Sequence, residues 1–329
     1  GGRLGFTLVE MLTVIVIIGI LAALISAATI YARARAREAA IYVQIKQMEA
    51  ALMEYKNQFG EFPPDFWGLH SSDPVVVTQA KQEVLRHLRR RWPRYQLRIT
   101  VEPTDTPDKI IDKQFKAFAD DVRALGIDPE RFDAATALVF WLGGLPAEPL
   151  VAGGTYQPAG FHADEEHPFQ LGQPRTGPLF EFDPKRIDWA SDHIWYRMDG
   201  PTSPPVVYFR AKKDAASGRS TYAINNEIAH FVYLLQKEDE KETADLAVAY
   251  LDGGTASATP VWRNPDTFQI IHPGLDGIYG ELLTRKIPNP WPVISEPQRW
   301  PVTITGAYFR MGDFDNITNF APKLESEIE

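Results

Sequence analysis

The 329-residue chain contains no cysteine. Disulfide bonds, thiol catalysis and cysteine-ligated zinc are therefore excluded. Basic residues are in the minority, because 34 lysines and arginines face 43 aspartates and glutamates, for a formal net charge of −9. This balance disfavours nonspecific nucleic-acid binding as the main task, so no nucleic-acid partner is expected. The hydrophobic share of 44% is ordinary for a folded protein, and the length suits about two domains.

The motifs of common enzyme families are also missing. The sequence has no G-x-S-x-G element, no P-loop and no dinucleotide-binding fingerprint. Two histidines with acids between them, His162 and His167, stand in an apparent loop, and their spacing matches no helical metalloprotease pattern. We expect this loop to be polar and solvent-exposed, and we expect the chain not to be an enzyme.

The N-terminal segment is extremely apolar. No charged residue occurs between Met11 and Ala32. As a helix this stretch would reach about 33 Å, enough to cross a hydrocarbon core of about 30 Å. A secretory signal usually has a shorter apolar region followed by a cleavage site, whereas here the helical pattern continues without a break. We therefore expect a membrane-spanning helix.

A carboxylate, Glu10, stands at the start of the apolar run, where burial without a partner would be costly. Residues 3–10 read RLGFTLVE. Cleavage between Gly5 and Phe6 would create an ammonium group at Phe6. The Glu10 carboxylate of a neighbouring subunit could neutralise that group within a helical assembly. The alternative is that Glu10 merely lies at the membrane interface.

At these residues the sequence resembles the type IV pilin and pseudopilin superfamily. Its members carry a short basic leader ending in glycine, an FTLxE-like start and a long apolar helix. The resemblance implies cleavage after Gly5 by a prepilin peptidase, N-methylation of Phe6, and Glu10 as the assembly carboxylate. Many members have proline where this chain has Ala27. Helix melting around that proline is therefore not carried over, and the leader GGRLG is expected to begin further upstream.

A basic collar and an amphipathic stretch follow the apolar run. The collar consists of Arg33, Arg35 and Arg37. With the head outside the cytoplasm, these arginines would lie on the outer side of the membrane, against the tendency of basic residues to stay on the cytoplasmic side. Apolar residues then recur at helical spacing, and we expect them to pack against the following domain: Ile41, Ile45, Met48, Leu52, Tyr55 and Phe59. One continuous helix is predicted over residues 6–58, ended by Gly60.

The end of this predicted helix resembles the major pseudopilin of type II secretion. That family has a Leu-x-x-Tyr helix end, a Gly-x-Tyr-Pro turn and a Gly-Leu pair a few residues later. Here residues 52–63 read LMEYKNQFGEFP, and Gly68 and Leu69 follow. Phe62 replaces the usual tyrosine and keeps the aromatic ring.

The remainder of the chain is larger than the head of that family. Helical patterns predict three helices, over residues 75–95, 109–125 and 129–142. Short β-like runs follow at 179–182, 193–196 and 206–209, whereas 228–236 and 246–251 fit either strands or a helix. The expected fold class is α+β: a long N-terminal helix packed on an antiparallel sheet head, with a helical insert.

These patterns divide the chain into four parts. They are a leader remnant (1–5), a transmembrane and filament-core helix (6–32), an amphipathic stalk helix (33–59) and a globular head (60–329) with the helical insert at about 70–150.

Two C-terminal segments carry oxygen donors of the kind that Ca²⁺ prefers. Residues 266–277 read DTFQIIHPGLDG and residues 312–320 read GDFDNITNF. Side-chain-capped turns are the alternative interpretation. Major pseudopilins end in a Gly-x-Asp-Gly turn and an Asp-Ile-x-Asn-aromatic segment that hold calcium, and the match is partial because an extra Asn316 interrupts it. The resemblance implies Ca²⁺, with Asp313, Asp315 and Asp276 as side-chain ligands.

The expected function is a structural subunit of a type IV pilin-like filament, with a type II secretion pseudopilin as the favoured kind. The expected partners are further copies of the chain in a helical homopolymer, minor pilins or pseudopilins, the prepilin peptidase and the inner-membrane assembly platform. Before assembly the chain would lie in the bacterial inner membrane with its head outside the cytoplasm, and afterwards in a periplasmic or cell-surface filament. Two alternatives stay open: a surface pilin for adhesion, motility or DNA uptake, and a membrane-tethered enzyme or binding protein with a pilin-like anchor.

Overall fold

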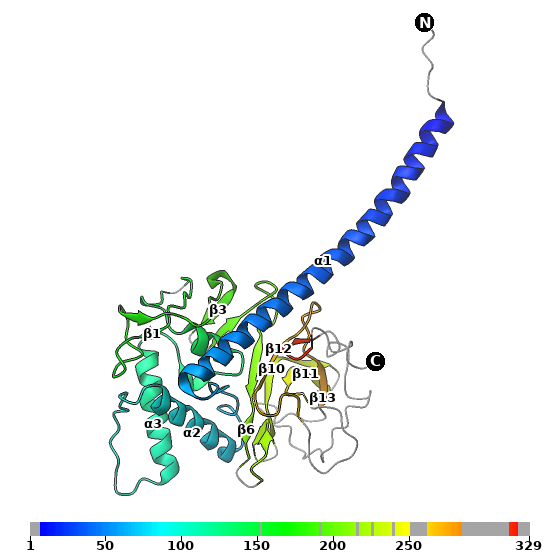
Figure 1. The fold of residues 1–329 in the computed structure, drawn as a ribbon. Coiled ribbons are helices and arrows are strands. Elements are labelled where there is room, and N and C mark those ends of the chain that lie inside the picture. The colour runs from blue at the N-terminus through cyan, green and yellow to red at the C-terminus, as the bar shows by residue number, and fades with distance from the viewer. Residues whose placement is uncertain are drawn as a thin grey trace.

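A long helix, α1 (Leu8–Phe59), projects from a head of shorter helices and strands (Figure 1). The computed structural model describes residues 7–151, 153–190, 193–214, 217–224, 227–238, 241–250, 262–284 and 316–321. The predicted α+β class is confirmed. The strands of the head form several small sheets rather than one continuous sheet.

The C-terminal half of α1 is anchored in the head by its apolar stripe. Ile45, Met48, Leu52 and Tyr55 have no exposed surface, which confirms the predicted stripe. Full burial of such a side chain stabilises the fold by about 1.5–3 kcal/mol. The helix ends at Phe59, one residue later than predicted. Gly60 stops it in the left-handed region with φ of 79°, and its N–H donates to the Lys56 carbonyl over 2.7 Å.

Two amphipathic helices, α2 (Pro74–Arg91) and α3 (Pro107–Arg123), pack against each other beside the end of α1 (Figure 1). Asp73 and Thr106 cap their first turns, and each helix has proline in its first turn, where a missing N–H costs nothing. The predicted extension of α2 to residue 95 is wrong. The helix ends at Arg91 because Pro93 disfavours helical backbone in the residue before it.

The predicted helix over residues 129–142 is also wrong. This stretch forms a 3₁₀ turn, η1 (Pro129–Arg131), then a single helical turn, α4 (Thr136–Leu138), and a π-helical turn, η2 (Val139–Gly143). The cause is Asp133. Its Oδ1 accepts hydrogen bonds from the backbone N–H groups of Ala135 and Thr136 at 3.0 and 2.9 Å, so it starts a second helical turn and interrupts the first.

Two three-stranded antiparallel sheets form the β part of the head. One has the order β14–β12–β5, with bounds Ile317–Thr318, Phe268–His272 and Val207–Arg210. The other has the order β10–β11–β13, with bounds His230–Glu238, Lys241–Val248 and Glu281–Thr284. Both segments that fitted either strands or a helix therefore contain strand, because residues 230–236 lie in β10 and residues 246–248 lie in β11.

The remaining strands form short antiparallel pairs. These are β1 (Phe161–His162) with β2 (Arg175–Thr176), β3 (Ile187–Ala190) with β4 (His193–Tyr196), β6 (Lys212–Lys213) with β7 (Ser220–Thr221), and β8 (Ala223–Ile224) with β9 (Glu227–Ile228). The strands predicted near residues 193 and 206 are confirmed as β4 and β5.

The strand predicted over residues 179–182 is wrong. The backbone N–H groups of Leu179 and Phe180 both donate to the Leu142 carbonyl, at 2.8 and 3.3 Å, so this segment lies against η2 and has no sheet partner. A 3₁₀ turn, η3 (Pro184–Arg186), follows before β3 begins.

The predicted insert shares its hydrophobic core with α1. A single buried cluster contains the α1 stripe, apolar residues of α2 and α3, and the aromatic side chains that follow them. Trp141 lies at its centre, with ring centroids 5.5 Å from Phe66 and 4.9 Å from His87. The helices of residues 74–123 are therefore part of the head core that holds the stalk.

Candidate functional site

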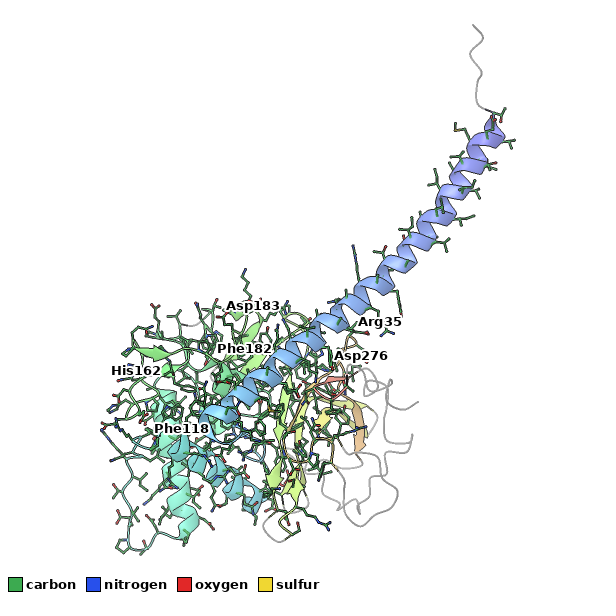
Figure 2. All side chains as sticks on the ribbon, viewed as in Figure 1. Arg35, Phe118, His162, Phe182, Asp183 and Asp276 are labelled. Carbon is green, nitrogen blue, oxygen red and sulfur yellow. The ribbon has the colours of Figure 1, made fainter. Side chains whose placement is uncertain are left out.

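The N-terminal half of α1 presents an apolar surface that nothing in the head covers (Figure 2). Leu8, Ile18, Leu24 and Ile30 are between 57% and 82% exposed. The helix is long and apolar enough to cross a membrane. An apolar surface on every side of a helix needs either lipid or other helices around it. This half of α1 is therefore the part of the described chain that needs surroundings beyond the head.

The first turn of α1 closes on itself through a capping box. Glu10 Oε2 accepts from the backbone N–H and the hydroxyl of Thr7, both at 2.8 Å, and the Glu10 N–H donates to Thr7 Oγ1 over 3.2 Å. Of the three predicted processing and assembly residues, Glu10 alone lies in the described part of the chain. Gly5 and Phe6 lie outside it, so the predicted cleavage and amine pairing stay predictions.

The basic collar lies where α1 leaves the head. Arg33, Arg35 and Arg37 are exposed. Arg35 forms an ion pair with Glu38 at 2.9 Å, and Arg37 reaches Asp199 of the head, also at 2.9 Å. Exposed pairs of this kind contribute little to stability, typically less than about 1 kcal/mol. The collar therefore contacts the head without fixing the projecting half of α1.

The predicted C-terminal constellation is only partly described. Asp276 is exposed at a turn near the C-terminal strands (Figure 2), and its Oδ1 accepts from the Ile278 N–H over 2.9 Å. Asp313 and Asp315 lie outside the described residues. The two segments do meet, because Ile317 pairs with His272 and Asn316 Nδ2 donates to the Tyr279 carbonyl over 2.7 Å. Ligation of calcium by this region stays a prediction.

The loop with two histidines differs from the prediction at one residue. His167 is exposed and bonds Asp164 over 3.0 Å, as expected for a polar loop. His162 is buried, which differs from the prediction. It belongs to β1, and its Nδ1 accepts from the Asp164 N–H over 3.1 Å. Within the described ranges no three His, Cys, Asp or Glu side chains form a group that could hold a metal ion.

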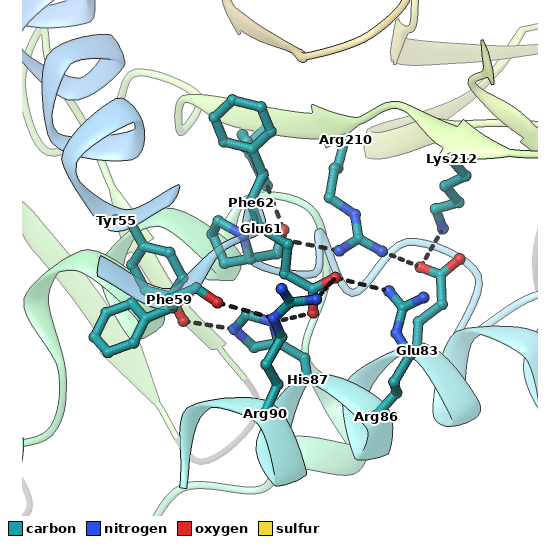
Figure 3. A network of polar contacts seen from close by, with 12 residues as sticks. Tyr55, Phe59, Glu61, Phe62, Glu83, Arg86, His87, Arg90, Arg210 and Lys212 are labelled. Atoms are coloured by element: carbon teal, nitrogen blue, oxygen red, sulfur yellow. Dashed lines mark hydrogen bonds and ion pairs between the residues drawn. The ribbon is translucent and has the colours of Figure 1, made fainter. Parts of the chain in front are cut away.

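A chain of polar contacts lies beneath the end of α1 (Figure 3). Arg91 donates to the Tyr55 hydroxyl over 2.6 Å, that hydroxyl lies 2.6 Å from His87 Nε2, and His87 Nδ1 lies 2.8 Å from Glu61 Oε1. Burial lowers the pKa of His87 to about 4, so the imidazole is neutral. Tyr55 then donates to Nε2, and Nδ1–H donates to Glu61, which ties the turn after α1 to α2.

A second charged group lies in the same place, and the sequence patterns did not predict it. It consists of Asp65, Glu83, Arg210 and Lys212. Arg210 donates to Glu83 over 2.8 Å, and Lys212 lies 3.5 Å from the same carboxylate oxygen (Figure 3). One signal was available. Arg210 and Lys212 follow the strand predicted over residues 206–209 and are two residues apart. In extended backbone both side chains would belong to one face, and a buried face with two cations requires buried acids.

Residues 2–26 match a family model, the prokaryotic N-terminal methylation motif. The chain has a type IV pilin-like N-terminus. This motif indicates processing by a prepilin peptidase and assembly into a filament, and the proteins that carry it are structural rather than enzymatic. Together with the apolar half of α1, it fits a pilin-like protein that is anchored in the membrane before assembly. No curated protein matches the chain, and no solved structure does.

Proposed function

We propose that this chain is a structural subunit of a type IV pilin-like filament, and that the filament belongs to a type II secretion system. The observation that carries the proposal is the uncovered apolar half of α1, continuous with a stalk whose other half is fixed in the head. Such a helix can exchange lipid for neighbouring copies of itself. Packing against those copies compensates for leaving the membrane, and the heads then face outward.

Assembly in this proposal depends on the first turn of α1. The prepilin peptidase cuts between Gly5 and Phe6, and the new amine of Phe6 is methylated. Glu10 of one subunit then pairs with the Phe6 amine of another. Opposite charges attract strongly in an apolar surrounding, so the pair sets the axial position of each incoming helix. The capping box with Thr7 holds the Glu10 carboxylate at the helix start until a neighbour arrives.

The secretion assignment rests on the end of the stalk. Tyr55 and Gly60 match the pattern of the resemblance, Phe62 replaces its tyrosine, and all three have structural tasks there. The Tyr55 side chain is fully buried, and Gly60 adopts the left-handed backbone that ends α1. Phe62 is buried against Phe268 of β12, with ring centroids 4.9 Å apart.

Calcium is a further part of this proposal. Asp276 and the aspartates at 313 and 315 would hold the ion, which would fix the C-terminal segment to the head. One observation supports a ligand here: Asn316 is fully buried, and no donor in the described part of the chain reaches its Oδ1 atom. An amide oxygen is a ligand that Ca²⁺ accepts.

The deciding experiment is mass spectrometry of the N-terminal peptide in two native fractions, sheared surface material and cell envelope. Methylated Phe6 that is confined to the envelope supports a secretion pseudopilin. Methylated Phe6 that is abundant in sheared filaments identifies a surface pilin instead. An intact GGRLG leader in both fractions overturns the filament proposal and favours a tethered enzyme or binding protein.

A further inference from the structure

Three ionisable side chains from distant parts of the chain meet beneath the end of α1. Asp65 follows the turn after α1, Glu83 lies on α2, and Lys212 begins β6. Lys212 Nζ lies 3.4 Å from Asp65 Oδ1 and 3.5 Å from Glu83 Oε2. Asp65 is 1% exposed and Lys212 6% exposed, so this contact is shielded from water.

The amine of Lys212 is close to both carboxyl groups without being hydrogen-bonded. No acceptor in the described residues forms a hydrogen bond with its buried Nζ atom. The Trp67 ring covers that atom at 4.7 Å from the ring centroid. An ammonium group held this way has lost its water and gained two long ion pairs and one aromatic face, but no hydrogen bond, which is a costly arrangement for a permanent charge.

The surrounding residues fix both carboxyl groups in place. The Arg210 backbone N–H donates to Asp65 Oδ2 over 3.0 Å, and the Arg210 guanidinium donates to Glu83 over 2.8 Å. Phe66, directly after Asp65, has φ of 57°, a left-handed backbone that is unfavourable for an aromatic residue. Strain of this kind persists where the surroundings hold a residue in one position, so the backbone next to Asp65 is fixed by its packing.

The two carboxyl groups differ in their tendency to ionise. Burial raises the pKa of Asp65, which favours the neutral acid. Burial also acts to raise the pKa of Glu83, but the Lys212 and Arg210 cations outweigh it and lower that pKa. Asp65 is thus disposed to be the neutral acid that an amine can attack, and Glu83 is disposed to be the ionised carboxylate, the form that a proton acceptor must have.

We propose that Lys212 and Asp65 form an intramolecular amide bond, with Glu83 as the catalytic residue that moves the protons. The Glu83 carboxylate takes one proton from the Lys212 ammonium group, and the neutral amine attacks Cγ of the protonated Asp65 carboxyl group. The new C–N bond forms and one C–O bond breaks. The departing hydroxyl leaves as water with a second proton from the nitrogen, so Glu83 ends protonated. No oxidant, reductant or cofactor is required.

The bond would give the head a covalent link that its composition otherwise lacks. The chain has no cysteine and therefore no disulfide. An amide between residues 65 and 212 joins the segment that leaves α1 to the sheet edge at β6. A pull along the stalk would then reach the strands through a covalent bond instead of through packing alone. This inference is independent of the filament proposal, because the bond depends only on the head.

The test is tryptic mapping of the purified full-length chain by mass spectrometry. The amide predicts a branched peptide that joins residues 57–81 to residues 211–213, lighter than the two parts by one water molecule, because trypsin cannot cut after an acylated Lys212. Recovery of both peptides unlinked, with cleavage after Lys212, overturns the proposal. This wild-type measurement decides the question without any variant.

Three variants test the roles of the residues. Lys212→Arg keeps the positive charge and is expected to abolish the branched peptide. Glu83→Gln keeps the side-chain shape and is expected to leave Lys212 and Asp65 unlinked in a protein that still folds, as judged by near-ultraviolet circular dichroism. A branched peptide that persists in folded Glu83→Gln overturns the role of Glu83. The matched control is Lys213→Arg, because Lys213 is the exposed neighbour that bonds Ser220 and Asp266, and the link should survive there.

Discussion

Lys46 Nζ lies 2.7 Å from the carbonyl oxygen of Asn319 and donates a hydrogen bond to it. The side chain of the same asparagine reaches the other way, and its Oδ1 accepts from the Ile270 N–H of β12 over 2.9 Å. Asn319 is 2% exposed. The C-terminal segment 316–321 is thereby held between α1 and the central strand of its sheet, so the stalk and the C-terminal motif support each other.

Asn319→Ala should destabilise the head by about 1–3 kcal/mol. The substitution leaves the buried Ile270 N–H without its acceptor, and an unsatisfied buried donor costs about that much. Denaturant unfolding of the full-length chain, followed by tryptophan fluorescence, measures the change. Lys46→Met is the comparison, because it removes only the partly buried hydrogen bond from Lys46 Nζ to the Asn319 carbonyl and should destabilise the head less. Equal losses in the two variants would show that the stalk contact, not the buried amide, holds this segment.

The predictions that rest on one helix proved the most reliable. The apolar stripe of α1 was correct because its periodicity alone determines which face is buried, and the glycine stop at Gly60 was correct to within one residue. The stretch 129–142 was predicted wrongly because its outcome depends on Asp133, whose carboxylate also accepts from Trp195 Nε1 at 3.0 Å. That partner is distant in sequence, and the local pattern around Asp133 by itself allows either a cap or a continuous helix.

The candidate site shows the same division between local and distant information. Glu10 was found from the spacing of a short motif, and the structure places it in a capping box with Thr7 only three residues away. Asp65, Glu83 and Lys212 could not be found this way. They come from three separate elements, and only the packing of α2 between the turn after α1 and β6 brings them together.

Glu10→Gln should abolish filaments, whereas Thr7→Ala should leave them largely intact. Glutamine can replace glutamate in a capping box, so this variant keeps the helix start and loses only the charge. Thr7→Ala keeps the Glu10 charge and removes the side-chain cap, which destabilises the start of the helix by about 1 kcal/mol. Electron microscopy of sheared or overexpressed filaments supplies the measurement, with immunoblotting to show that the leader is still removed. Filaments in Glu10→Gln with none in Thr7→Ala would mean that the cap, not the charge, is required.

Calcium should raise the melting temperature of the chain, and Asp276→Asn should weaken that effect. The substitution removes one negative charge from the predicted ligand set but leaves an oxygen that can still accept from the Ile278 N–H. Differential scanning fluorimetry with added calcium and with chelator measures both chains. Asp266→Asn is a suitable control, because Asp266 is exposed and its partners are Ser220 and Lys213 instead. A wild-type melting temperature that ignores both calcium and chelator contradicts the prediction.

The head should lose stability as the pH falls from about 6.5 to about 4, and His87 should account for much of the loss. Burial lowers the pKa of His87 from 6.5 to about 4, and the Arg210 and Arg91 cations act in the same direction against the hydrogen bond to Glu61. In this window the unfolded chain binds a proton at His87 and the folded chain does not, so acid favours unfolding. At about 1.4 kcal/mol per pKa unit, the loss approaches roughly 3 kcal/mol.

His87→Gln removes this titration while keeping a polar side chain between Tyr55 and Glu61. The variant should be less stable than the wild type at neutral pH, because the fit is poorer, and its stability should depend less on pH. Some dependence remains, since burial also lowers the pKa of His272 to about 3. Thermal unfolding at neutral and at mildly acidic pH measures both effects, with the exposed His167→Gln as control. If His87→Gln and wild type lose the same stability on acidification, His87 is not the group responsible, and the neutral Tyr55–His87–Glu61 chain is assigned wrongly.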